Sequence, residues 1–281
     1  MKRLRITHST GYRYEGEVTA SYNEARMLPI SATRQLVLHS NVEIAPVSSH
    51  HQYTDYWGTR VLAFDVLAPH TELTLSASSL VEVLDPAPHA EGLAWDELRR
   101  VRFTAGEYVQ QLPQTALTEP ADEVAGIAAT IDGLGEGPCE AALEICRRVG
   151  EAVEYVSGVT GVTSTAAEAW ADRKGVCQDI THIAIGALRS VGIPARYVSG
   201  YLHPSPDAVV GETVVGESHA WVEWFCGSWH GYDPTNQLEI GDRHVRVGHG
   251  RDYTDVAPLR GVYAGPTASE LFVSVEITRE A

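Results

Sequence analysis

The sequence predicts an α+β protein in two units: an antiparallel β-sandwich over residues 1–85, and a unit over residues 86–281 with helices in its first half and an antiparallel sheet in its second. Three observations predict this class. Alternating apolar and polar residues fill the first unit, prolines interrupt that pattern near residue 86, and helical periodicity then precedes a return of alternation at residues 195–233.

The first unit consists of short runs with a period of two, such as Gln-Leu-Val-Leu-His-Ser-Asn-Val-Glu-Ile at residues 35–44. Asp-Tyr-Trp-Gly-Thr at residues 55–59 lies between two runs and places Gly58 where a hairpin needs a positive φ. Asp-Pro-Ala-Pro-His at residues 85–89 then favours an extended linker. We expect the domain boundary there.

The second unit opens with helical patterns. Helices are predicted at residues 121–131 and 139–153, each of which follows a proline that suits a first helical turn. Thr165 and Glu168 have the spacing of a capping box, which predicts a short helix that ends before Gly175. Because the strands follow these helices as a block, the order favours α+β over a doubly wound parallel sheet.

Charge excludes some partners. The net charge is −16, and residues 86–281 contain 14 basic and 28 acidic residues. Such a field repels nucleic acid and anionic membranes and favours basic or amine-bearing partners, although an acid excess also serves solubility. The chain start lacks the apolar stretch of a signal peptide, and no run of about 18 apolar residues occurs. We therefore expect a cytoplasmic protein that binds neither nucleic acid nor membranes.

No cofactor or metal is predicted, because dinucleotide, P-loop and HExxH motifs are absent. The four cysteines show no CxxC spacing and are too few for a secreted disulfide framework, which indicates a reducing compartment and argues against structural zinc. Cys139 and Cys146 are expected to pack on the apolar face of their helix. Cys226 is expected to be unreactive or merely oxidisable at the surface.

Cys177 differs from the other cysteines by its position. It lies in Gly-Val-Cys-Gln-Asp-Ile-Thr-His at residues 175–182, where an apolar run of helical spacing begins and continues to Gly192. In a first helical turn, unpaired N–H groups and the positive end of the helix dipole stabilise a thiolate and can hold an oxyanion. The alternative is a small buried side chain that only packs.

A predicted hairpin supplies partners for this cysteine. Residues 217–224 alternate as a strand, and the chain returns through Trp-His-Gly-Tyr-Asp at residues 229–233. A histidine at the start of one strand and an aspartate at the end of its partner can meet side by side. Cys177, His219 and Asp233 therefore form a candidate triad of nucleophile, base and orienting group.

The hairpin register tests the triad. A two-residue loop would pair Asp233 with Val222 and turn it away from His219. A three-residue loop, residues 226–228, would pair Asp233 with Trp221, which shares the face of His219. We therefore predict an odd-length loop or a bulge, with Gly227 in the left-handed conformation.

The residues around the triad resemble those of the bacterial transglutaminase-like proteins of the papain-like superfamily. The resemblance implies that Cys177 is the nucleophile, His219 the general base and acid, and Asp233 the group that orients the imidazole. One departure is Ile180, where relatives often have an aromatic residue. The matching stretches are residues 175–182, 192–201, 218–223 and 232–236 in the second unit, residues 55–58 and 69–73 in the β unit, and residues 252–263 near the end.

The resemblance implies acyl transfer on peptide or isopeptide amides through a thioester. Water as acceptor makes the protein a cysteine peptidase or amidase, and a primary amine makes it a transamidase. A non-catalytic binding scaffold of the same fold is the third possibility. The Cys177 N–H is the first candidate for the oxyanion donor, Tyr155, Trp170 or Gln178 could supply a second, and His182 is expected to be structural.

Overall fold

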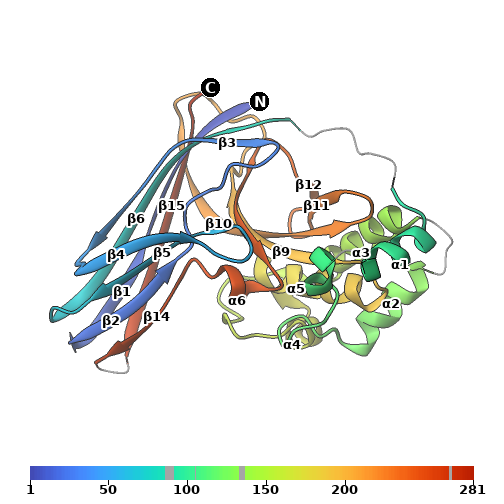
Figure 1. Cartoon of the computed structure of the whole chain (residues 1–281), viewed down its shortest axis with the longest axis horizontal. Helices are drawn as coiled ribbons and strands as arrows, with labels where there is room; N and C mark the ends of the chain where they lie inside the picture. Colours follow the sequence, from blue (N-terminus) through green and yellow to red (C-terminus); the bar gives the residue numbers. More distant parts are fainter. Residues whose placement is uncertain (86–91, 105, 133–136, 266–267) are drawn as a thin grey trace.

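The computed structural model describes residues 1–85, 92–104, 106–132, 137–265 and 268–281. The predicted α+β class is confirmed: a layered β unit lies on one side of the molecule and a group of helices on the other (Figure 1). The predicted linker at residues 86–89 lies outside the described residues.

The β unit is a sandwich of two antiparallel sheets. Alternation explains its strands, since every second residue from Leu73 to Val83 is buried. Side chains from both sheets form one apolar core that includes Val18, Phe64 and Leu75. One layer has the order β15 (Ser269–Arg279), β1 (Lys2–Val18), β6 (His70–Val83), β3 (Gln35–Ala45); the other has β14 (Leu259–Ala264), β2 (Ala20–Ala25), β5 (Arg60–Val66), β4 (Ser49–Thr54). The turn before β5 contains Gly58 with the expected positive φ, 80°.

The last two strands return to the first unit. β15 pairs antiparallel with β1, where Ile277 lies opposite Ile6, and β14 pairs with β2, where Leu259 lies opposite Ala25. The chain ends therefore lie near each other (Figure 1). The alternating pattern of β14 and β15 predicts that they are strands, but it does not predict which other strands they pair with.

The predicted helices are present within about two residues of their expected bounds. The Thr165–Glu168 capping box forms, and Pro138 is the first residue of its helix. Among the described residues no helix combines the length and the apolar character needed to cross a bilayer. The helices are α1 (Trp95–Thr104), the 3₁₀ helix η1 (Gly106–Gln111), α2 (Asp122–Asp132), α3 (Pro138–Ala152), α4 (Ala166–Asp172), α5 (Cys177–Ser190) and α6 (Tyr253–Val256).

A second sheet region lies against α5. Strand β10 joins the two regions, because residues 213–216 pair with β15 and residues 217–224 pair with β9. A continuous nine-stranded sheet therefore runs through both units, which couples the sandwich to the helical core. The remaining strands are β7 (Glu154–Tyr155), β8 (Lys174–Gly175), β9 (Ala195–Leu202), β10 (Thr213–Phe225), β11 (Trp229–Asp233), β12 (Leu238–Glu239) and β13 (His244–Gly250).

The cysteine predictions need correction. Cys226 is fully buried instead of at the surface, and it forms a disulfide with Cys139, which therefore does more than pack on its helix. The two Cα atoms lie 5.6 Å apart, although 87 residues separate them in sequence. Local spacing failed here because the first turn of α3 meets the β10–β11 loop only in the folded chain. Cys146 is free and buried, as expected.

Candidate active site

Cys177 is the first residue of α5 and is half-buried. The buried carboxylate of Asp179 organises this helix start: it accepts the Val176 N–H at 2.8 Å and the Thr160 hydroxyl at 2.6 Å. Burial raises the pKa of Asp179, and the two hydrogen bonds oppose that rise. The N–H groups that begin α5 and the positive end of the helix dipole therefore lie at the cysteine.

The hairpin that follows has the predicted register. Val222 pairs with Tyr232 and Phe225 with Trp229, so three residues form the loop. Gly227 in that loop has a φ of 120°, in the positive region that the prediction requires. This register places Asp233 beside His219, and His219 Nε2 lies 2.7 Å from Asp233 Oδ2.

Asp233 is fully buried but fully supplied with hydrogen-bond donors. Its Oδ1 accepts the N–H groups of Thr235 and Asn236 at 3.1 Å each, and its Oδ2 also accepts Asn236 Nδ2 at 2.8 Å. Burial by itself would raise the pKa of Asp233, but the contacts from His219 and His244 outweigh it and hold that pKa well below its usual range. Asp233 is therefore a fixed anion next to the imidazole.

His219 lies between two partners. Its Nε2 faces Asp233, and the Cys177 side chain is the second group that contacts the imidazole. Burial lowers the pKa of His219, but hydrogen bonds with Asp233 and Cys177 outweigh it and raise the pKa from 6.5 to about 10. At neutral pH the imidazole is therefore a cation that links the carboxylate to the sulfur.

We expect the His219 imidazole to remain protonated at pH 8, whereas an ordinary histidine loses its proton near pH 6.5. Because the folded pKa lies above the unfolded value, this group's contribution to stability is fully present below about pH 6.5 and is lost as pH rises towards 10. NMR titration of the imidazole signals tests this, with His219→Gln used to assign the resonance. Cys177→Ala should lower the midpoint, because one contact that raises it is removed. A wild-type midpoint near 6.5 would contradict the arrangement.

The predicted second oxyanion donors have different surroundings. The indole N–H of Trp170 donates to Glu123 at 2.9 Å. The pKa of Tyr155 is raised to about 12, first by burial, then by the nearby charge of Glu217, and then by the nearby Cys177 side chain. The Tyr155 hydroxyl donates to Glu217 at 3.1 Å. Gln178 Nε2 donates to the Val162 carbonyl at 3.4 Å.

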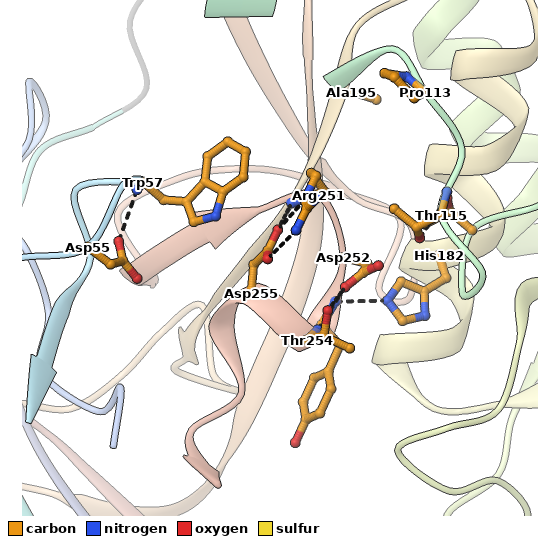
Figure 2. A network of polar contacts seen from close by, with 12 residues as sticks. Asp55, Trp57, Pro113, Thr115, His182, Ala195, Arg251, Asp252, Thr254 and Asp255 are labelled. Carbon is orange, nitrogen blue, oxygen red and sulfur yellow. Dashed lines mark hydrogen bonds and ion pairs between the residues drawn. The ribbon is translucent and has the colours of Figure 1, made fainter. Parts of the chain in front are cut away.

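His182 has the structural role that its position predicts. It is fully buried, and its Nε2 accepts the Tyr253 N–H at 3.1 Å (Figure 2). Burial is the main cause that lowers the pKa of His182, to about 4, so the ring is neutral and can accept this hydrogen bond. It thereby fixes the start of α6 to α5, next to the Asp252 side chain that caps α6.

Sequence reasoning missed two residues at the site, Asn236 and His244. Asn236 belongs to the Asp-Pro-Thr-Asn turn, whose composition suggests a turn but not a contact with the triad. His244 Nε2 lies 3.5 Å from Asp233 Oδ2, and His244 Nδ1 accepts the Gly241 N–H, which keeps the ring proton on Nε2. Asp233 thus lies between two imidazoles. No local signal indicates His244, because β13 reaches Asp233 only through the sheet.

Two family profiles match this chain. Residues 4–82 match the bacterial transglutaminase-like N-terminal region, and residues 125–234 match the transglutaminase-like superfamily. The chain belongs to the transglutaminase-like superfamily. The second match spans Cys177, His219 and Asp233, and the first covers most of the strands of the β-sandwich.

Mycobacterial relatives resemble this transglutaminase-like chain from end to end. An uncharacterised protein of Mycobacterium leprae is 48% identical, with 100% of both chains covered. An uncharacterised protein of Mycobacterium tuberculosis is 33% identical, with 98% of this chain and 92% of the relative covered. The sandwich and the core therefore occur together in these relatives.

A solved structure shows the same fold. It is a protein of Cytophaga hutchinsonii, provisionally described as a cysteine protease, with a TM-score of 0.79 and 21% identity. The match covers 99% of this chain and 90% of that one. The fold is thus shared over nearly the whole length of both chains.

Proposed function

We propose that this protein is a thiol-dependent acyl-transfer enzyme that hydrolyses peptide or isopeptide amides. One observation carries the proposal: His219 contacts Asp233 at 2.7 Å and is held as a cation beside Cys177, which begins a helix. A binding scaffold has no need for a buried carboxylate, an imidazolium and a half-exposed thiol in contact with one another. Perturbed titratable groups that converge in this way are typical of catalytic sites.

The groups define a sequence of steps. Cys177 Sγ attacks the amide carbon, and the oxyanion forms at the N–H groups that begin α5. His219 gives its proton to the leaving nitrogen, the C–N bond breaks, and a thioester remains on Cys177. Water then attacks the thioester as His219 takes a proton from it, the S–C bond breaks, and the carboxylic acid leaves. Asp233 holds the charged imidazole in position throughout.

Transamidation is the second candidate, because an acidic side chain contacts Tyr155, whose pKa the Cys177 side chain also raises. Glu217 is exposed and shares the strand face of His219, two residues away, and it accepts the hydroxyl of Tyr155. A carboxylate in this place, within a unit of net negative charge, attracts a cationic amine to the thioester. Mass analysis of the products separates the two reactions, since hydrolysis yields an acid and transamidation adds the mass of the amine.

Alkylation by iodoacetamide without reductant tests the proposal. We expect Cys177 to be labelled selectively below pH 7, and His219→Ala to slow that labelling, because the cation that stabilises the thiolate is removed. Peptide mass spectrometry reads each cysteine separately. Cys146 is the internal control, since burial raises the pKa of its thiol far above the usual range.

One labelling result would contradict the proposal. If Cys177 reacts no faster than Cys146, and His219→Ala leaves its rate unchanged, the thiol is not activated. The binding scaffold would then be the better description of this protein.

A further inference from the structure

Three ligand-forming side chains meet outside the triad. Cys139 is in the first turn of α3, Cys226 is at the β10–β11 loop, and His230 is on β11. Their sulfur and nitrogen atoms all lie within 4.8 Å of one another. Cys226 is fully buried, His230 is 8% exposed, and Cys139 is partly exposed. The cluster is therefore enclosed, with access from the side of Cys139.

The chemistry of this set suits one kind of metal. Two thiolates and an imidazole are ligands that Zn²⁺ prefers, and tetrahedral Zn²⁺ places such atoms about 3.5–3.8 Å apart. Cys139 Sγ already lies 4.0 Å from His230 Nε2. Ser228 Oγ lies 3.0 Å from the same nitrogen, so a hydroxyl or a water can occupy the fourth position. The His230 ring stacks with Trp224, which restricts its orientation.

In the structure the two sulfurs are bonded to each other, and so they are not available to a metal. We propose that Cys139, Cys226 and His230 form a redox-gated Zn²⁺ site that is closed by the disulfide and opened by a dithiol reductant. The dithiol supplies two electrons and two protons, the S–S bond breaks, two thiols form, and the reductant becomes a cyclic disulfide. Zn²⁺ then displaces the thiol protons as it binds.

The site lies at the loop that joins the strands of His219 and Asp233, so a disulfide or a bound Zn²⁺ there would hold that loop against α3. The loop that holds Cys226 joins β10, which carries His219, to β11, which carries Asp233. The disulfide ties this loop to α3, and a shared Zn²⁺ would tie the same two elements. The Cys226 carbonyl also accepts the Leu93 N–H at 2.7 Å, so the loop is held from a second side. The hairpin that carries His219 and Asp233 thus stays attached to α3 in the oxidised chain and in the reduced chain that has bound Zn²⁺.

Zinc binding by the full-length protein tests the proposal. The chain is reduced with dithiothreitol, desalted without oxygen, equilibrated with Zn²⁺, and assayed for metal by atomic emission and by competition with a chromogenic chelator. We expect one Zn²⁺ per reduced chain and none in the oxidised chain. Cys139→Ser and His230→Gln should each weaken binding about tenfold or more. Cys177→Ser, the matched control at the other partly exposed cysteine, should bind Zn²⁺ as wild type does. Circular dichroism checks that each variant is folded.

Three results would overturn the proposal. The first is a reduced chain that binds no Zn²⁺. The second is a disulfide that dithiothreitol does not open in the native protein. The third is binding that survives Cys139→Ser and His230→Gln but is lost in Cys177→Ser, which would place the metal at the triad instead.

Discussion

Asp233→Asn is expected to slow the acylation of Cys177 by about 10²–10⁴-fold while the protein stays folded. The neutral amide cannot stabilise the imidazolium through the 2.7 Å contact, so the pKa of His219 falls and less of the cation is present beside the Cys177 sulfur at neutral pH. Asparagine fills nearly the same volume, and the Thr235 and Asn236 N–H groups can still donate to its oxygen. The burst of p-nitrophenolate from an activated ester measures the acylation rate.

Asp242→Asn is the matched control, because it makes the same chemical change at a carboxylate that contacts Lys2 at 3.2 Å instead of the triad. It should leave the burst rate unchanged. If Asp233→Asn acylates as fast as wild type, or if both variants lose rate equally, then Asp233 does not orient His219.

Arg189→Met is expected to destabilise the protein by about 3–5 kcal/mol, because it leaves several buried carbonyls without a donor. Arg189 is 5% exposed, near the end of α5, and its guanidinium joins segments far apart in the sequence. It donates to the carbonyls of Gln111, Pro113, Ala195 and Arg251, at 2.8–3.2 Å, and to the Thr118 hydroxyl at 3.2 Å. Figure 2 labels three of these residues, Pro113, Ala195 and Arg251, among the residues of the polar network near α6.

Thermal unfolding measures this loss, and a fall in Tm of roughly 10 °C is expected for a chain of this size. Arg147→Met is the control, since Arg147 is half-exposed on α3 and forms ion pairs with Glu144 and Glu151 at the surface. That change should cost less than about 1 kcal/mol. Equal shifts in the two variants would show that the buried contacts of Arg189 contribute no more than surface charge.

Most of the candidate site was predictable from local sequence patterns. The helix that begins at Cys177 was predictable from apolar spacing and from the Gly192 and Pro194 that end it. The three-residue loop was predictable because a shift of one residue would have turned Asp233 away from His219. The partner of Trp170 was not predictable: Glu123 lies 47 residues away on another helix, and only packing brings its carboxylate to the indole.

The sequence by itself determined where the main helices and strands lie and made Cys177, His219 and Asp233 a candidate triad, because periodicity, caps and turns act over a few residues. Tertiary structure alone decided the Cys139–Cys226 link, the His244 contact with Asp233, and the return of β15 to β1. Each of these joins residues far apart in the chain. Their meeting depends on how apolar faces of different elements pack, and no short stretch of sequence encodes that arrangement.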